Sequence, residues 1–274
     1  MSASPPDGPG ELFSRRRLLE LAGVTGVAVA AAACTTRSVA TPTPSSGPAS
    51  VLSPSALADP LPENVPVVAP APVTMSAGLV CRDVWGARPA RPGGTPHTIS
   101  RMTLHHTAVV LGDNRNITSR LRQHQRYHQD QQGWIDIAYH LGVDRNGNIF
   151  ELRTPELAGD TATSYDPRGH FLVVCEGDFD QEAATEAQLH GAAVAFAWAA
   201  QTFGVTTDTL AGHQDYASTT CPGANLHAHI ASGDLKHRVD DLVVAGTVDL
   251  QRLCGPDAAA VVAAIEAGAS THVP

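Results

Sequence analysis

Three residues of metal-binding type carry the clearest chemical signal in this chain. His213 and Cys221 lie close together in the segment AGHQDYASTTCPG (211–223), and a histidine pair, His105 and His106, stands far upstream. Two imidazoles and one thiolate make three ligands for a zinc ion. A catalytic zinc keeps its remaining position for water, whereas a structural zinc takes four protein ligands. The set therefore predicts a zinc hydrolase.

The first forty residues have the composition of an export leader. A twin-arginine pattern, Arg15 to Arg17, precedes a run rich in Ala and Val at 21–33. That run is shorter than the about 20 apolar residues that a spanning helix needs, so residues 1–40 are predicted to be a twin-arginine signal peptide. Two continuations stay open, lipidation of Cys34 in a lipobox-like sequence or ordinary cleavage near Ala40. Both predict export to the cell envelope, as a lipid-anchored, periplasmic or secreted protein.

Composition divides the remainder of the chain. Residues 41–78 are rich in proline and almost without charge, which predicts an extended linker. Residues 79–245 are enough for one domain with a sizeable core, and 246–274 form a C-terminal extension in which 256–267 are expected to be a short helix.

The charge balance excludes one class of partner. The chain has a formal net charge of −9, and Lys236 is its only lysine. A nucleic-acid-binding protein needs a basic face, and none is apparent. Contact with a membrane is expected only through the leader or a lipid on Cys34. We expect a monomer.

Periodicity and turn residues predict an α/β fold with a mixed central β-sheet and helices packed on its faces. The clearest helix begins at the capping pair Thr185 and Gln188 and ends at Gly204. The turn 144–147 predicts a β-hairpin. Strands are expected at 101–107, 135–143, 148–152, 171–175 and 209–212, and helices at 117–131, 185–203 and 226–244.

Several motifs, in order along the chain, resemble those of one family, the peptidoglycan recognition proteins and zinc-dependent N-acetylmuramoyl-L-alanine amidases. The motifs are RDVWGA (82–87), LHHTA (104–108), YH (127–128), GWIDIAYH (133–140), DRNG (144–147), GH (212–213) and CPG (221–223). The resemblance covers residues 81–242. It implies a single domain of the amidase fold that hydrolyses the amide bond between N-acetylmuramic acid and L-alanine in peptidoglycan or muropeptides.

The resemblance also implies which residues act. Zn²⁺ would be held by His105, His213 and Cys221; neighbouring side chains of a strand point to opposite faces, so His105 and His106 would not both reach one ion. Tyr139 matches a catalytic tyrosine that hydrogen-bonds the attacking water or the oxyanion. Thr219 stands where phage-type members carry a lysine, and its hydroxyl brings no positive charge.

The groove around the metal departs from the family pattern at 159–163 and 165–171, which leaves the preferred stem peptide open. His106, Arg153, Tyr165 and Arg168 are nevertheless candidates for binding substrate, the arginines through stem-peptide carboxylates. His124 and His128 are spaced i, i+4 and could together bind a metal, but a polar, Gln-rich helix face carries such residues without one, which is the interpretation that we favour.

Two further hypotheses concern the cysteines. Cys81 and Cys254 flank the domain and could form a disulfide in an exported protein, while Cys175 is expected in a buried strand. The alternative function is a peptidoglycan-binding module without catalysis. Cys221 discriminates between the two, because non-catalytic recognition proteins typically lack the zinc-binding cysteine.

Overall fold

The computed structural model describes residues 73–270, which fold around a seven-stranded sheet in the order β6-β2-β5-β3-β4-β1-β7. Only β3 and β4 pair antiparallel, and the other neighbours are parallel. The predicted mixed sheet is confirmed. The strands are β1 (Val73–Val80), β2 (Arg101–His106), β3 (Leu141–Val143), β4 (Ile149–Glu151), β5 (His170–Cys175), β6 (Leu210–Gly212) and β7 (Gly246–Leu253).

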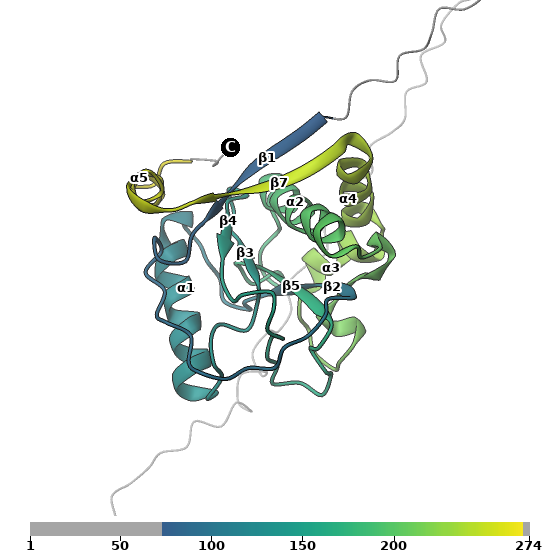
Figure 1. Cartoon of the computed structure of the whole chain (residues 1–274), viewed down its shortest axis with the longest axis horizontal. Helices are drawn as coiled ribbons and strands as arrows, with labels where there is room; N and C mark the ends of the chain where they lie inside the picture. The colour runs from purple at the N-terminus through teal and green to yellow at the C-terminus, as the bar shows by residue number, and fades with distance from the viewer. Residues whose placement is uncertain (1–72, 271–274) are drawn as a thin grey trace, which may run out of the picture. The chain divides into compact units, whose positions relative to one another are not determined.

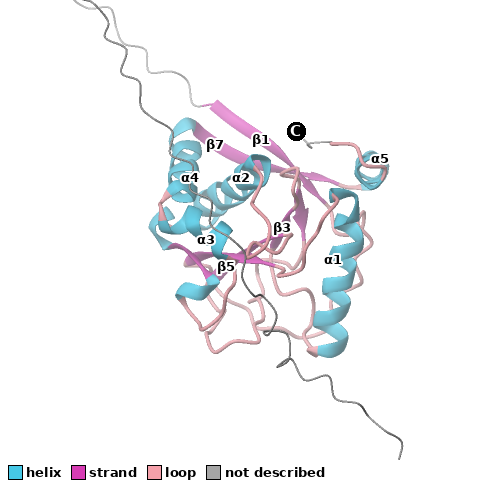
Figure 2. Cartoon of the chain, turned by 180° about the vertical axis from the view of Figure 1, so that it is seen from behind, coloured by secondary structure: helices cyan, strands magenta, loops and turns pink. Residues whose placement is uncertain are grey.

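Helices cover both faces of this sheet, as predicted. They are α1 (Ile117–Arg126), α2 (Glu186–Phe203), α3 (Ala224–Ala231), α4 (Asp234–Ala245) and α5 (Gly255–Glu266). In Figure 1, α1 lies on one side of the sheet and α2 and α4 lie on the other. Long loops gather between α1 and α3, as Figure 2 shows in pink. The leader and most of the predicted linker lie outside the described residues.

The central strand β5 is buried along its whole length, so its alternating side chains supply both cores. Phe171, Val173 and Cys175 belong to the cluster that packs under α2. Val174 belongs to the cluster that includes Ile117 and Leu121. Strand β2, which carries the predicted ligand His105, pairs with β5 along all six of its residues.

The longest helix begins and ends where the sequence predicts. The hydroxyl of Thr185 accepts a hydrogen bond of 3.0 Å from the Gln188 N–H, and Gly204 closes α2 with a left-handed φ of 65°. The second hydrogen bond of a capping box, from the Thr185 N–H to the Gln188 side chain, is replaced. The Gln188 side chain donates instead to the carbonyls of Val143 and Glu176. That bond ties the start of α2 to the ends of β3 and β5.

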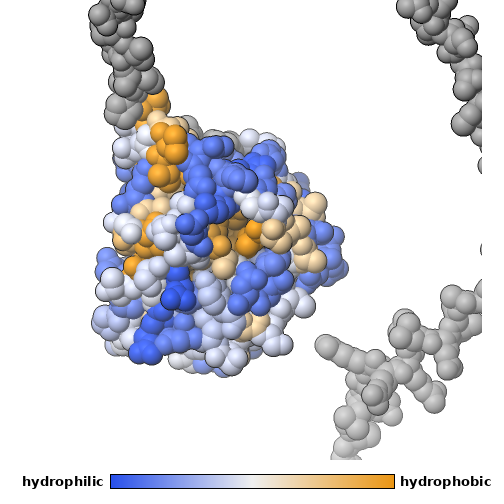
Figure 3. Space-filling model, turned by 90° about the vertical axis from the view of Figure 1, so that its right-hand side faces the viewer, coloured by the Kyte–Doolittle hydropathy of each residue, from blue (hydrophilic) through white to orange (hydrophobic). Residues whose placement is uncertain are grey.

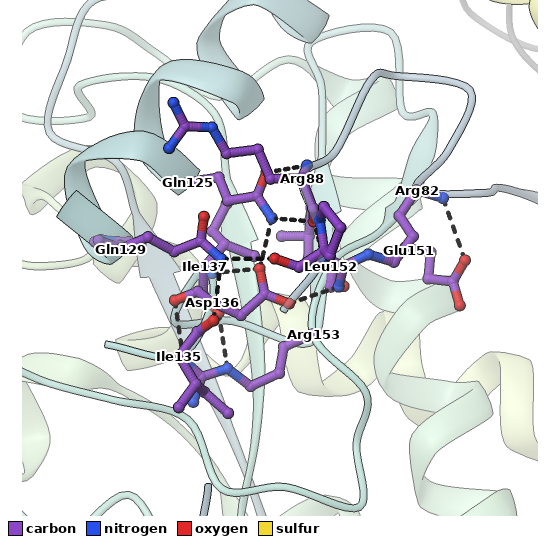
Figure 4. Close-up of polar contacts among 12 residues, drawn as sticks. Arg82, Arg88, Gln125, Gln129, Ile135, Asp136, Ile137, Glu151, Leu152 and Arg153 are labelled. Atoms are coloured by element: carbon purple, nitrogen blue, oxygen red, sulfur yellow. Dashed lines mark hydrogen bonds and ion pairs between the residues drawn. The ribbon is translucent and has the colours of Figure 1, made fainter. Parts of the chain in front are cut away.

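Two predicted elements differ from the structure. The helix expected over 226–244 is two helices, because Gly233 adopts a left-handed φ of 78° between α3 and α4. The strand expected over 135–143 is regular only from Leu141, because side chains satisfy much of the backbone of residues 135–138. Gln129 donates to the Ile135 carbonyl (3.0 Å) and Arg153 to the Ile137 carbonyl (2.9 Å), as Figure 4 shows.

A C-terminal clasp, which we define as β7 and α5, closes the sheet. β7 pairs in parallel with all eight residues of β1, and a Cys81–Cys254 disulfide joins the two strands just beyond their ends, with Cα atoms 5.1 Å apart. Val262 and Ile265 of α5 are buried in the cluster beneath α1. The hypothesis of a disulfide between the ends of the domain is confirmed, and the sheet extends beyond residues 79–245 on both sides.

The described surface is mainly hydrophilic. The face drawn in Figure 3 carries small apolar patches in an otherwise hydrophilic surface. The large exposed apolar side chains are Val73, Val109, Val110, Tyr127 and Val244. Within residues 73–270, no helix has the length and apolar character needed to cross a bilayer.

Candidate metal centre

The three predicted ligands meet at the carboxyl ends of two neighbouring strands. His105 is the fifth residue of β2, and His213 directly follows β6, which pairs with β2 so that Leu104 lies opposite Gly212. Cys221 comes from the loop before α3. Its sulfur lies 3.6 Å from His105 Nδ1, and one ligand atom from each of the three residues lies within 4.8 Å of the others.

The chemistry of this group fits a zinc ion. Burial lowers the pKa of His105 well below its usual value and that of His213 to about 4, so both imidazoles are neutral, which is the form that binds metal. Burial raises the pKa of the Cys221 thiol to about 12, so forming the thiolate requires a cation beside it. His105 Nε2 is buried without a hydrogen-bond partner in the described residues. Two nitrogens and one sulfur are a donor set that suits zinc.

The neighbouring histidine turns to the other face of β2. His106 Nδ1 accepts a hydrogen bond of 3.4 Å from the Phe179 N–H, and its ring stacks on the Phe179 ring. Its backbone, rather than its ring, contacts Cys221: the His106 N–H lies 3.4 Å from the Cys221 sulfur and the His106 carbonyl oxygen lies 4.0 Å from it. The strand alternation therefore separates the two imidazoles as predicted, although the His106 residue still lines the cavity.

The two predicted catalytic hydroxyls lie beside the ligands. The Tyr139 ring centroid is 5.0 Å from that of His105, and burial raises the pKa of Tyr139 well above 10, so its hydroxyl stays a hydrogen-bond donor. The Thr219 hydroxyl accepts a hydrogen bond of 3.2 Å from the Cys221 N–H. Both residues line the cavity that contains the ligands.

One contact to the ligands escaped the sequence interpretation. The hydroxyl of Thr163 lies 2.7 Å from His213 Nε2, and this hydrogen bond orients the imidazole. Tyr165, a predicted substrate residue, packs with its ring centroid 4.9 Å from that of His213. The sequence marked the loop 159–163 as a departure from the family pattern, but nothing in it distinguished Thr163 from the other residues of the loop.

The ligands open into a cavity of about 830 Å³. Its walls come from the end of β2, from α1 and the turn that follows, from the loop 160–163 and from 219–221. His124 of α1 and His128 of the helical turn Tyr127–Gln131, predicted to lie on a polar helix face without a metal, both line this cavity. His128 is buried, accepting a hydrogen bond of 3.2 Å from the Ala138 N–H.

The two arginines expected to contact substrate do not reach this cavity. Arg153 is 2% exposed, and its guanidinium donates to the carbonyls of Asp136, Ile137 and Ala158 and pairs with Asp160. Its role is to hold the 136–138 and 158–160 backbone. Arg168 is exposed and pairs with Asp166 two residues before it. The structure thus gives neither arginine a place in the cavity wall.

Comparisons with known proteins agree with this fold and site. Residues 95–224 match the model of a family described as N-acetylmuramoyl-L-alanine amidase. Peptidoglycan-recognition protein SC2 of Drosophila simulans is 27% identical over 159 residues, which are 57% of this chain and 86% of that protein. N-acetylmuramoyl-L-alanine amidase of Homo sapiens is 33% identical over 153 residues, 53% of this chain but 26% of that protein.

A solved structure shows the same architecture. Human PGRP-IBETAC, in complex with glycosamyl muramyl pentapeptide, aligns with a TM-score of 0.51 and 26% identity, covering 57% of this chain and 95% of that one. The fold is an α/β domain whose cavity contains two histidines and one cysteine that could hold a metal ion. Residues 95–224 are thus similar to the N-acetylmuramoyl-L-alanine amidase family, and the domain resembles peptidoglycan recognition proteins in sequence and fold.

Proposed function

We propose that this protein is a zinc-dependent N-acetylmuramoyl-L-alanine amidase that hydrolyses the bond between the lactyl group of N-acetylmuramic acid and the L-alanine of the stem peptide. The observation that carries the proposal is the buried group of His105, His213 and Cys221, with one ligand atom from each residue within 4.8 Å of the others. Because Cys221 is present, the full ligand set of a catalytic zinc can form.

His105, His213 and Cys221 would hold the zinc, which when bound polarises a carbonyl and lowers the pKa of water toward about 7. The chain's other residues then orient and stabilise. Thr163 keeps the His213 ring in place. Tyr139 and Thr219 present hydroxyl donors, and the oxyanion that forms as the amide carbonyl is attacked needs such donors.

The proposed substrate rests on the chemistry of the cavity and on the relatives. A solved relative holds a muramyl pentapeptide, and the cavity volume of about 830 Å³ lies in the range of sites that enclose a small ligand. The proposed role is remodelling or recycling of the cell wall outside the cytoplasm. Export through the twin-arginine leader, with the domain acting as a monomer, completes this proposal.

Purified protein incubated with muropeptides, with and without a zinc chelator, tests the function. We expect release of peptides that begin with L-alanine, suppression by the chelator and recovery on adding zinc. Binding of muropeptide without release, in protein loaded with zinc, would instead support the non-catalytic recognition function of the same family. Fractionation of cells that produce the full chain tests export, and a radiolabelled or mass-shifted lipid on Cys34 tests lipidation.

A further inference from the structure

A buried ion pair lies in the cavity wall, and neither the zinc ligands nor the proposed hydroxyl donors include it. His124 of α1 places Nδ1 3.2 Å from Oε1 of Glu176, the residue directly after β5. The side chains are 13% and 1% exposed. Removing a carboxylate from water is unfavourable by several kcal/mol unless a partner compensates it, and His124 is the only side chain that the described residues give Glu176.

The sheet places Glu176 on the metal side. His105 of β2 lies opposite Val174 of β5, and partners in a parallel pair share a face. Side chains two residues apart on a strand also share a face, so Glu176 continues the face of His105 and Val174 beyond the end of β5. The negative charge of Glu176 is among the influences that raise the pKa of Tyr139, which agrees with this placement.

His124 has one nitrogen committed and one free. Glu176 accepts from Nδ1, whereas Nε2 is buried without a hydrogen-bond partner anywhere in residues 73–270. His124 is also part of the wall of the cavity that contains His105, Tyr139 and Cys221. A buried carboxylate that holds one ring nitrogen, and thereby presents the other, is the arrangement by which hydrolases orient an imidazole as a base.

The hydrolysis proposed above requires a group that carries a proton from water to the departing amine. Tyr139 and Thr219 offer hydroxyls, which donate hydrogen bonds but do not take a second proton near neutral pH. An imidazole can do both. We propose that His124 is the general acid–base of this amidase and that Glu176 is its positioning residue, an inference that rests on the proposed function.

The proton balance of this step is simple. As the water oxygen bonds to the amide carbon, one water proton moves to the lone pair of His124 Nε2, and the imidazolium formed is stabilised by the Glu176 carboxylate. The Nε2 proton then moves to the amide nitrogen as the carbon–nitrogen bond breaks. The products are the lactyl carboxylic acid, which ionises in water, and the free α-amine of L-alanine. His124 returns to its neutral form.

The charges around His124 suit this cycle. Burial lowers the pKa of His124, but the Glu176 carboxylate raises it more, so the pKa of His124 lies above its usual value of 6.5. Arg120, one turn earlier on α1, opposes that rise. His128, one turn later, is held neutral because burial lowers its pKa to about 3. Of these two histidines of the wall, His124 is therefore the one whose pKa its surroundings raise, whereas that of His128 is lowered.

Muropeptide hydrolysis by zinc-loaded variants of the full chain tests the assignment. For His124→Gln we expect kcat to fall about 100-fold or more, the contribution typical of general acid–base catalysis, with KM and zinc content near those of the wild type. In His124→Ala, added imidazole should restore at least part of kcat. His237→Gln, a matched histidine change on the exposed part of α4, should leave kcat unchanged.

Glu176→Gln supplies a readout that a merely structural pair would not move. Loss of the carboxylate removes what raises the pKa of His124, so the lower limb of the pH profile of kcat/KM should shift to lower pH. Wild-type kcat in His124→Gln overturns the inference, as does an unmoved pH profile in Glu176→Gln or a His124→Ala variant that keeps zinc yet gains nothing from imidazole. Inactivity of the zinc-loaded wild type instead overturns the proposed function itself.

Discussion

Two regions of the molecule are built in opposite ways: the C-terminal clasp and the end of the sheet where His105, His213 and Cys221 lie, which we call the metal end. There, His105 converges with His213 and Cys221 from a segment about a hundred residues later, and each of the three is a residue type that binds metals. The clasp is a long parallel pairing of β1 with β7, one disulfide and a small apolar helix, and most of its residues are ordinary. The family match ends at residue 224, so the clasp lies outside it. The proposed catalysis thus depends on a few residues at the metal end, whereas the contribution of the clasp to folding stability is distributed over many residues.

Cys221→Ser should have the largest effect on the rate of hydrolysis and should not change the folding stability of the metal-free protein. A change in the hydrogen bonds behind a ligand typically lowers metal affinity or activity 10- to 100-fold, so losing the ligand itself should lower hydrolysis by at least about 100-fold. In chelator, the unfolding curves of the wild type and the variant should coincide, because neither protein then has any stability contributed by bound metal. Equal hydrolysis rates would remove Cys221 from the metal group.

The double change Cys81→Ser with Cys254→Ser should lower the folding stability and leave the rate of hydrolysis almost unchanged. The disulfide closes a loop of 173 residues, and removing such a bond lowers the free energy of unfolding by about 2–5 kcal/mol. Denaturant unfolding measures this loss, and kcat at 25 °C should stay within twofold of the wild type. A large fall in kcat with little change in stability would show that the clasp acts on the site directly.

Thr163→Val tests whether a residue that contacts a ligand, but is not one itself, contributes to zinc binding. The variant removes the 2.7 Å contact with His213 Nε2, so we expect zinc affinity to fall about 10- to 100-fold, as measured by competition with a chelating dye. Ser164→Ala changes the next hydroxyl of the same loop, which is exposed, and should leave zinc affinity unchanged. Equal affinities in the two variants would contradict the orienting role of Thr163.

The smallest effect concerns pH, because one buried pair at the metal end also contributes to stability. Glu176 raises the pKa of His124 above 6.5, so the pair's contribution is fully present below about pH 6.5 and is lost as the pH rises through the raised value. The free energy of unfolding of the zinc-loaded protein should therefore fall over that window. Glu176→Gln should flatten this dependence, and an unchanged slope would show that the pair does not couple to folding.

The same contrast explains what could be predicted from sequence. The predicted ligands His105, His213 and Cys221 stand in motifs of rare residue types. Strand alternation predicted that His105 and His106 do not both reach one ion, and the family resemblance decided which of the two does. Thr163 and Glu176 were missed because their roles depend on which side chain the fold brings opposite them. Arg153 was predicted to bind substrate, but backbone carbonyls of two loops surround its guanidinium.

The fold shows a similar division. Helix α2 could be placed from Thr185 and Gly204, because capping is encoded within one turn. The strands β1 and β7 could not be placed, because their partners lie far along the chain and neither segment shows a strong alternation. The start of β3 was placed too early because the preceding residues hydrogen-bond with side chains such as Gln129 and Arg153 instead of a strand.

The central claim is that His105, His213 and Cys221 hold a zinc ion that the hydrolysis requires. Elemental analysis of the purified protein, with the hydrolysis rate measured on the same sample, tests it most directly. We expect one zinc per chain, with the rate falling in proportion as the chelator removes the metal and returning when zinc is added. Full hydrolysis by protein that contains no zinc would contradict the account.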